Sequence, residues 1–584
     1  MMLGAYLAYT LIERLGNGPV GYWGAVLLAA VLVGALGVLI ERTLLKRLYG
    51  APELLQLVAT FGVVLLIKDA VLALWGPEDL LGPRAPGLAG ALHILGRPVP
   101  QYDLLLIVVA PVVLVVLTLL LSRTRWGLLV RAATEDREMT AALGVNPSWL
   151  FASVFFVGAL LAGLAGALQL PREPANLNID LTVIADVFVV TVVGGLGSIA
   201  GAFVAALIIG VVKALCIGIG DVTLLGATVP FAKLTLVAEF VVMAIVLVAR
   251  PWGLFGRAWG TAAAVGEREL QRLPTRGFAI GCALLLVALI VAPFIVDEYA
   301  LVLVTDMLLF ALFAVSLQFI MGTGGMASFG HAAYFGLGAY AAALLSRALP
   351  MELALIIAPL AAGLGALVFG WFCVRLSGVY LAMLTLAFAQ ITWAIVYQWD
   401  AVTGGSNGLV GVWPSPWLSS RAAYYWLTLA VATIAIAALW RLMFGPFGYA
   451  LRGARDSPRR AAAIGIDVSA VRWAGFVTAG LFAGIAGALY AFSKGSIAPD
   501  TLSIPRSVDG LVMVLLGGLQ TLLGPVVGGA VLIWLQDTLA RHTEYWRAML
   551  GAAILVLVLV FPQGIVGTLA TLSRRRRQTR AGPA

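Results

Sequence analysis

Long apolar runs recur along almost the whole chain, and they restrict its fold more than any other feature. The runs lie near residues 20–40, 54–75, 103–122, 148–170, 199–217, 228–249, 278–296, 300–321, 329–348, 351–373, 379–398, 424–440, 469–491, 524–541 and 546–562. An α-helix needs roughly 20 apolar residues to cross a bilayer, because the hydrocarbon is about 30 Å thick and each residue rises about 1.5 Å. The pattern predicts an all-α, polytopic membrane protein.

Composition supports lipid as the solvent. Of the 584 residues, 62% are hydrophobic and 11% are charged, whereas soluble domains carry about 25% charged residues. The net charge of +9 could suggest nucleic acid as a partner. However, the basic residues lie in short loops and form no stripe with aromatics, so we expect no nucleic-acid binding. The cysteines and histidines are scattered without metal-ligand spacing, and we expect no metal site.

The basic residues also predict an orientation, because cytoplasmic loops carry an excess of Lys and Arg. The segments predicted to be cytoplasmic are 42–47, 123–137, 250–276, Arg375, 441–460 and 574–577. The segments predicted to be external are 77–102, 171–181, 400–422 and 494–506. This alternation is self-consistent along the chain.

A polar stretch from Arg250 to Arg276 interrupts the apolar runs in the middle of the sequence. We read it as a linker between two membrane domains. The predicted organisation is a first domain at 1–256, a cytoplasmic linker at 257–277, a second domain at 278–570 and a basic cytoplasmic tail at 571–584.

Three sequence patterns occur once in each half, in the same order. The pattern at 125–135, followed by Gly144, recurs 321 positions later at 446–456, followed by Gly465. The pattern at 186–201 recurs 323 positions later, and Leu3-Gly4-Ala5-Tyr6 recurs at 337–340. Corresponding loops carry the same charge, so we expect two homologous domains in parallel orientation.

The first cytoplasmic loop (123–147) and the second cytoplasmic loop (441–468) each have the spacing of a short helix that ends at a glycine. One such helix in each half predicts a docking surface for a two-fold symmetric soluble partner, although an ordinary solvated loop would carry similar charges. The residues that define this candidate surface are Arg131, Ala132, Glu135 and Gly144 in the first loop and Arg452, Asp456 and Gly465 in the second.

Each half also has a short apolar segment that ends at a Gly-Gly-Leu element. The segment 182–193 would be about 18 Å long as a helix, which is too short to span. Gly-interrupted segments at matching positions indicate either a substrate pathway or close helix packing. The residues concerned are Asp186, Gly194 and Gly195 in the first half and Asp509, Gly517 and Gly518 in the second. For the two aspartates we favour a structural or interfacial role, and proton coupling is the alternative.

Polar residues inside apolar runs are candidates for lining a solute path. They cluster in 322–331 and 385–390, where glycines permit irregular backbone at membrane depth. The candidates are Ser328, His331, Thr385, Gln390 and, in the first half, Thr60. The alternative is that these side chains only form hydrogen bonds across packed helices.

The second half resembles the M-type permease subunit of a high-affinity branched-chain amino acid (Liv-type) ABC importer, in the segments 324–340, 375–390, 403–409 and 561–564. The first half resembles the H-type subunit in 57–62, 193–198 and 250–256. Together these segments suggest that the chain is a fusion of both subunits.

The resemblance implies that the two cytoplasmic loops contact two cytoplasmic ABC ATPase subunits, and that a periplasmic binding protein delivers the solute. The chain has no Gly-x4-Gly-Lys-Ser/Thr phosphate loop, so we expect no cofactor on it and ATP with Mg on the partners. We expect a bacterial inner-membrane transport subunit rather than an enzyme. Its solute would be a branched-chain amino acid, with urea, short amides or aromatic acids as alternatives, and a stand-alone secondary transporter is the alternative function.

Two positions depart from the resemblance. Met1-Met2-Leu3-Gly4-Ala5-Tyr6 begins inside a motif that has 300–336 before it in the second half. We therefore expect either a missing opening helix or a misassigned start codon. Gln520 replaces a glycine that Gly197 keeps in the first half, so the two Gly turns are not expected to be identical.

Overall fold

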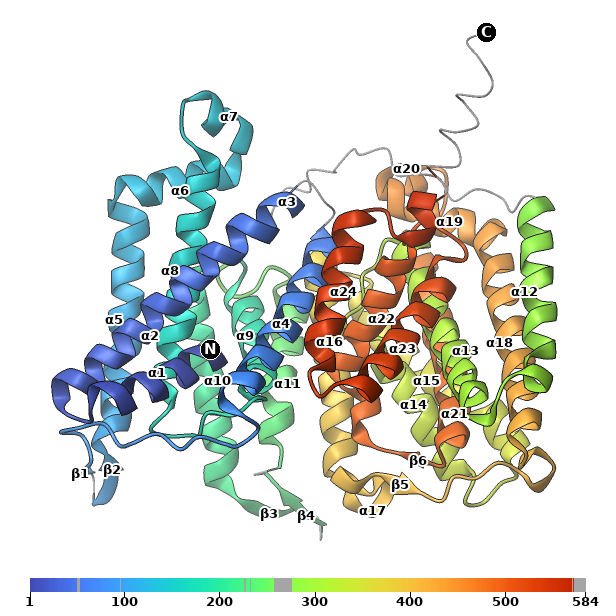
Figure 1. The fold of residues 1–584 in the computed structure, drawn as a ribbon, viewed down its shortest axis with the longest axis horizontal. Helices are drawn as coiled ribbons and strands as arrows, with labels where there is room; N and C mark the ends of the chain where they lie inside the picture. The colour runs from blue at the N-terminus through green and yellow to red at the C-terminus, as the bar shows by residue number, and fades with distance from the viewer. Residues whose placement is uncertain are drawn as a thin grey trace. The chain divides into compact units, whose positions relative to one another are not determined.

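The computed structural model describes residues 1–49, 53–94, 96–224, 227–231, 233–256, 276–569 and 571. Most of the predicted linker and all but one residue of the predicted tail lie outside this part of the chain. The predicted domain limits therefore stay predictions. Most described residues are helical (Figure 1).

The chain forms two compact units. Unit 1 comprises Met1–Phe188 and Tyr545–Ala552, and unit 2 comprises Val189–Glu544 and Ala553–Ala584. The division passes through α9 and α24, so each unit takes part of these two helices.

Unit 1 contains the helices of the first half up to α9 and one hairpin. Its elements are α1 (Met2–Leu15), α2 (Pro19–Ile40), the π-helix η1 (Glu41–Leu45), α3 (Lys46–Leu48), α4 (Glu53–Trp75), β1 (Ala91–Ile94), β2 (Arg97–Pro100), α5 (Gln101–Arg123), α6 (Arg125–Glu135), α7 (Arg137–Ala142), α8 (Pro147–Gln169) and α9 (Ile179–Gly194).

Unit 2 begins with α10 (Ile199–Ile219), β3 (Asp221–Leu224), β4 (Ala227–Pro230), α11 (Thr235–Ala249) and α12 (Arg276–Ile295). Its central elements are α13 (Glu298–Gln318), the π-helix η2 (Phe319–Thr323), α14 (Ala332–Leu345), α15 (Met351–Cys373), α16 (Gly378–Gln398), α17 (Asp400–Thr403), η3 (Gly405–Asn407), β5 (Leu409–Val410), η4 (Pro416–Leu418) and α18 (Arg421–Phe444). It ends with α19 (Pro446–Asp456), α20 (Pro458–Ala463), α21 (Val468–Lys494), β6 (Ser496–Ile497), η5 (Pro499–Leu502), α22 (Ile504–Gly517), α23 (Gly524–His542) and α24 (Trp546–Val560).

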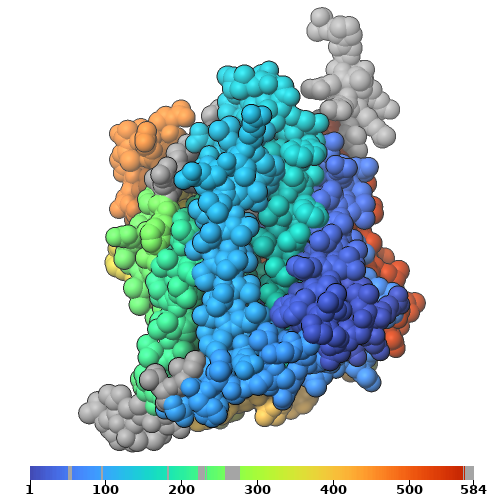
Figure 2. Space-filling model, turned by 90° about the vertical axis from the view of Figure 1, so that its left-hand side faces the viewer, coloured from blue at the N-terminus to red at the C-terminus, as the bar shows by residue number. Residues whose placement is uncertain are grey.

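Twelve helices among the described residues are long and apolar enough to cross a membrane. They differ in how far the protein covers them. The apolar window of α5 is not buried at all, and Figure 2 shows this helix along the surface of unit 1. By contrast, most of α16 and α21 is buried inside unit 2. The first kind of helix suits a lipid-facing position, and the second forms the core.

Each unit contains a close contact between glycines that the repeat predicts to be equivalent. In unit 1, a Cβ on Gly4 of α1 would overlap the backbone of Gly163 in α8. In unit 2, a Cβ on Gly338 of α14 would overlap the backbone of Gly484 in α21. Small residues let helix backbones approach closely in a membrane. The same glycine contact in both units is the structural counterpart of the sequence repeat.

The ends of each unit agree with the predicted orientation. In unit 1, α6 and α7 lie at the end opposite the β1–β2 hairpin, and in unit 2, α19 and α20 lie at the end opposite β5 and α17 (Figure 1). The basic loops are therefore separated from the segments predicted to be external within each unit.

Two apolar runs are shorter as helices than the sequence indicates. The run 228–249 begins as a helix only at Thr235, because Ala227–Pro230 is the strand β4, which pairs antiparallel with β3. The run 329–348 is reduced to α14, because the glycine-rich stretch before it is irregular. The sequence also gives no indication of the hairpin in which Ala91 pairs with Pro100.

Candidate functional site

The second cytoplasmic loop folds as two short helices, α19 and α20, rather than the single helix expected. Gly448 allows the tight turn from α18 into α19, since a Cβ there would overlap the carbonyl of Met443. Ser457 separates the two helices. Gly465 follows α20 with a φ of 87°, a conformation that favours glycine. The predicted glycine stop is therefore present, with an extra break before it.

Arg452 attaches α19 to the end of α18. Its side chain is buried, its Nη2 donates to the Met443 carbonyl at 2.8 Å, and its guanidinium lies over the rings of Phe444 and Tyr449. Burial lowers the pKa of Arg452 from its ordinary value, but arginine remains protonated in proteins. The contact therefore places a fixed positive charge at the start of this loop.

Arg455 attaches α19 to the interior of unit 2. Its side chain is only 5% exposed, its Nε donates to Asp456 Oδ1 at 2.7 Å, and its Nη1 donates to the Gly322 carbonyl in η2. Arg472 of α21 adds a hydrogen bond of 2.9 Å to the Ala454 carbonyl. Sequence reasoning did not single out Arg455, which reads like any other basic residue of a cytoplasmic loop.

The first cytoplasmic loop has a similar backbone. It forms α6 and α7, separated at Asp136. A Cβ on Gly127 would overlap the Leu121 carbonyl, and Gly144 has a φ of 86°. However, Arg131, Ala132 and Glu135 are all exposed. The equivalent loops are thus built on the same glycines but present different side-chain surfaces.

The first loop is attached through stacking instead. The Arg137 guanidinium of α7 lies 5.3 Å from the centre of the Tyr49 ring and 5.1 Å from that of Phe151. The Tyr49 hydroxyl donates to Glu41 Oε1 at 2.7 Å. Burial and this hydrogen bond raise the pKa of Tyr49, so the phenol stays protonated. This chain of contacts leads from the loop to η1, the π-helix that follows α2.

A helix break lies between η2 and α14 in unit 2. We call residues Gly324–His331 the helix break. Gly325 has a φ of 68°, and a Cβ on Gly330 would overlap the Thr385 carbonyl of α16. The Phe329 N–H donates to Thr385 Oγ1 at 3.1 Å, and the Ala332 N–H donates to Ser507 Oγ at 3.1 Å. The irregular backbone is therefore packed inside protein, as membrane depth requires.

Four of the five predicted path residues lie in the helix break or on α16, which packs against it. Ser328, His331, Thr385 and Gln390 are all buried in unit 2. Thr60 is different: it lies on α4 of unit 1, is exposed, and donates to the Leu57 carbonyl of its own helix. The path role of all five remains a prediction.

His331 is held by Ser316 of α13, with 2.8 Å between Nε2 and Oγ. Because the serine hydroxyl donates to the Phe313 carbonyl at 2.7 Å, the histidine must donate, which assigns the proton to Nε2. Within the described part of the chain, His331 Nδ1, Ser328 Oγ and Thr323 Oγ1 are buried without a hydrogen-bond partner. Buried polar atoms normally have partners. Packing across helices therefore accounts for Thr385 but not for Ser328.

The two Gly turns each form a clasp with the segment after a later helix. In the first clasp, the Leu254 N–H donates to the Val193 carbonyl at 2.8 Å, and the Phe255 N–H donates to the Gly194 carbonyl at 3.0 Å. A Cβ on Gly195, whose φ is 99°, would overlap Gly256. In the second clasp, a Cβ on Gly564 would overlap the backbone of Gly518.

The second clasp also depends on Gly517, since a Cβ there would overlap Gly524 at the start of α23. Close packing is thus one function of these glycines. A role in a substrate path remains a prediction.

Asp509 belongs to a group of charges in the half of unit 2 predicted to be external. Its Oδ2 lies 3.6 Å from Arg506 Nη1, and Lys494 Nζ lies 2.7 Å from Asp306 Oδ2. The Arg506 guanidinium also lies over the Phe310 ring. Asp186, the first-half equivalent of Asp509, is partly buried in α9. The sequence did not indicate Arg506, nor Asp306 and Lys494, which are distant from each other along the chain.

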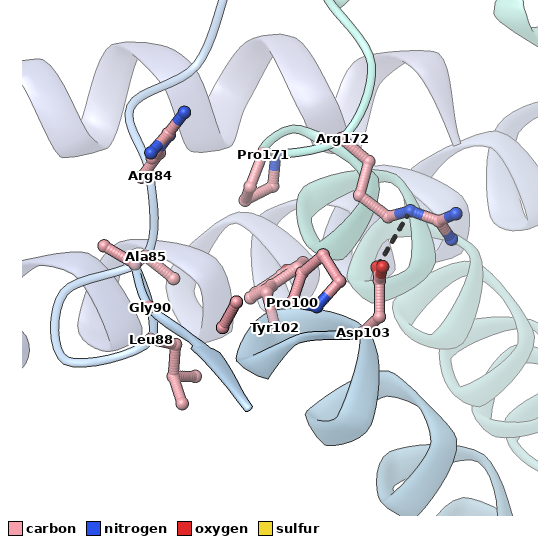
Figure 3. A pocket seen from close by; sticks show the side chains of 11 residues that line it. Arg84, Ala85, Leu88, Gly90, Pro100, Tyr102, Asp103, Pro171 and Arg172 are labelled. Atoms are coloured by element: carbon pink, nitrogen blue, oxygen red, sulfur yellow. Dashed lines mark ion pairs between the residues drawn. The ribbon is translucent and has the colours of Figure 1, made fainter. Parts of the chain in front are cut away.

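Unit 1 has a pocket of about 360 Å³ at its hairpin end. Figure 3 shows Arg84, Tyr102, Asp103 and Arg172 around it, and the dashed line marks the ion pair between Arg172 Nε and Asp103 Oδ1, which are 3.3 Å apart. The pocket is open and carries both signs of charge. Arg84 and Arg172 lie in loops predicted to be external, and Asp103 lies in the first turn of α5.

Comparison with known protein families identifies the repeat. The sequence profile described as "Branched-chain amino acid transport system / permease component" matches twice, at residues 1–249 and 299–559. The two matches correspond to the two halves and leave out the predicted linker.

Individual relatives give the same result. The permease protein LivM of the high-affinity branched-chain amino acid transport system of Salmonella typhimurium is 24% identical over 312 residues, which cover 48% of this chain and 73% of LivM. BraD of Pseudomonas aeruginosa is 31% identical over 266 residues, covering 44% of this chain and 83% of BraD. LivH of Salmonella typhimurium is 26% identical over 270 residues, with coverage of 44% and 83%.

Proposed function

The chain belongs to the family of permease components of branched-chain amino acid transport systems, and we propose that it is the membrane subunit of an ATP-driven importer for these amino acids or related small polar solutes. It is a multi-pass protein of the inner membrane, with twelve candidate spans among its described residues. The observation that carries the proposal is the family match in both halves, each with its own pair of short loop helices.

The proposed partners are two cytoplasmic ATPases, one docked on α6–α7 and the other on α19–α20. ATP and Mg would be bound and used by those partners. Support comes from the equivalent backbone of the two loops, each with a glycine of positive φ after its second helix, Gly144 and Gly465. A periplasmic binding protein would deliver the solute to the opposite end of the chain.

The proposed solute path passes the helix break in unit 2. The buried, unpartnered Ser328 Oγ and His331 Nδ1 support this, because a polar solute can supply the hydrogen bonds that the described residues do not. Discontinuous helices at membrane depth often mark transport sites. Closure of the ATPases would move the loop helices, and the break would move with them.

The decisive experiment is reconstitution of the chain with its ATPase and binding protein in liposomes. ATP hydrolysis is then measured with leucine, urea or an aromatic acid. We expect leucine to stimulate hydrolysis and to accumulate inside the vesicles. Stimulation by urea or the aromatic acid alone would change the solute class but retain the importer.

Two outcomes would contradict the proposal. An ATPase that docks but responds to none of the solutes would contradict the importer. Failure of every ATPase to dock, with solute uptake driven by an ion gradient, would establish a secondary transporter instead.

A further inference from the structure

We propose that Arg455 is a positioning residue that transmits movement of the second cytoplasmic loop to the helix break. The inference rests on the proposed function and extends it, since it names the link between the ATPase-docking surface and the solute path. In this role Arg455 acts through the backbone of η2, to which it is hydrogen-bonded.

The position of the side chain supports this role. Arg455 lies on α19 with its side chain 5% exposed, whereas its neighbours Asp456 and Arg459 are exposed. Its Nη1 donates to the Gly322 carbonyl of η2, and the Phe447 ring of α19 stacks on Phe319 of η2. An arginine buried to this extent within a basic loop is not explained by the positive-inside rule, which favours solvated charges.

The Gly322 carbonyl is available because the helix ends there. The Gly325 N–H donates to the Met321 carbonyl, and the Met326 N–H donates to the Ile320 carbonyl. The last carbonyls of a helix lack intrahelical partners and need other donors. Arg455 supplies that donor to Gly322, so the loop helix and the broken helix share one hydrogen bond at the point where the helix stops.

Gly325 makes room for this contact. A Cβ on Gly325 would overlap Cγ of Arg455, and its φ of 68° already favours glycine. The aliphatic part of Arg455 therefore packs directly on the first turn of the break. Ser328 and His331 follow within the same short segment.

The guanidinium is fixed at both ends of its fork. Nε is held by Asp456 Oδ1 at 2.7 Å, while Nη1 is held by Gly322. Arginine can make two such bonds in a rigid plane, whereas lysine presents a single rotatable ammonium group. When α19 moves, Gly322 should therefore move with it, because the side chain that joins them is rigidly held.

Among the described residues, the first cytoplasmic loop has no arginine link of this kind at the matching position. The position matching Arg455 is Thr134, which is exposed and donates to the Arg131 carbonyl of its own helix. The two ATPase-docking surfaces therefore differ in mechanical role. The second loop drives the helix break, and the first does not do so through this position.

The test compares Arg455→Ala and Arg455→Lys with a matched control, Arg47→Ala, which replaces an exposed arginine of α3 outside both proposed docking surfaces. ATPase docking, basal hydrolysis and solute-stimulated hydrolysis are measured for each. We expect Arg455→Ala to dock the ATPase normally and to keep the basal rate of hydrolysis. Its solute-stimulated rate should fall about tenfold, because the substitution removes a charged hydrogen bond. Arg455→Lys should be intermediate, and Arg47→Ala should behave like the unmodified chain.

Hydrogen exchange provides a second readout that does not require solute stimulation. In the unmodified chain, ATPase docking should change the exchange of backbone amides in residues 319–331, and in Arg455→Ala this response should be lost. An unchanged exchange response in Arg455→Ala would overturn the proposal. Normal solute-stimulated ATP hydrolysis in this variant would also overturn it, as would a loss of ATPase docking as large as the loss of stimulated hydrolysis. If the unmodified chain itself shows no stimulation, the importer function fails, and the exchange response alone decides on Arg455.

Discussion

The two cytoplasmic loops have nearly the same backbone but are attached to the protein in different ways. Both contain two short helices, a glycine that permits a tight entry (Gly127 or Gly448) and a glycine with positive φ at the exit. In the second loop, Arg452 and Arg455 are buried and bonded to main-chain carbonyls. In the first, the equivalent Arg131 is exposed.

The difference shows that the glycines of the repeated loop are determined by its backbone path, whereas the arginines are determined by the residues against which the loop packs. The glycines are required wherever the helix makes this turn, because a Cβ would overlap the preceding helix or require positive φ. The arginines depend on what lies beneath the loop. In unit 2 they reach free carbonyls, whereas in unit 1 a different arginine, Arg137, stacks on Tyr49.

The largest expected difference between the loops concerns Arg452 and Arg131. Arg452→Ala should lower the free energy of unfolding by about 2 kcal/mol, because it removes a buried hydrogen bond and two ring contacts. Arg131→Ala should change it by less than about 0.5 kcal/mol, since its side chain is exposed. Thermal unfolding of the detergent-solubilised protein measures both. Equal shifts would show that the two arginines are equivalent after all.

A smaller difference is expected for charge reversal. Asp456→Lys and Glu135→Lys should both reduce solute-stimulated ATP hydrolysis without unfolding the chain, because both lie on proposed docking surfaces. Asp456→Lys should have the larger effect, since it also removes the partner of Arg455 Nε, although a half-exposed pair contributes only about 0.5 kcal/mol to stability. Normal stimulation in both variants would exclude these surfaces as docking sites.

The smallest difference is expected at the exit glycines. A Cβ on Gly144 or Gly465 would meet nothing within 4 Å, so replacement by alanine introduces only the strain of positive φ. Gly144→Ala and Gly465→Ala should each cost about 1 kcal/mol, which is typical of alanine in that conformation. The two variants should lower the unfolding temperature equally. Unequal shifts would mean that the two exit turns differ in strain although their φ angles are nearly the same.

Much of the fold follows from the sequence, because apolar runs of spanning length have few alternatives in lipid. The helices α5, α15 and α16 begin and end within a few residues of their predicted runs. The helix break is also visible, since 322–331 is rich in glycine. Helix α11 was overestimated because Thr228 and Val229 continue an apolar run while in fact pairing as a strand.

The contacts of the candidate site are less visible. Arg455 binds a main-chain carbonyl 133 positions away, and no pattern in the sequence marks a carbonyl as free. The pair formed by Asp306 and Lys494 is likewise separated by 188 positions. Such contacts depend on how helices are placed in three dimensions, which the period of a single helix does not determine. The sequence predicts the loops, and the structure adds the contacts by which they are attached to the helices.

The two clasps have a consequence for the order of events during synthesis. The first clasp joins Val193 and Gly194 to Leu254 and Phe255, and all four residues precede the second half of the chain. The second clasp joins Gly518 to Gly564, both late in translation. Chains begin to fold from the N-terminus as they are made. The first clasp can therefore form before the residues of the second clasp are synthesised. A translational pause near residue 275 would separate the formation of the two clasps in time.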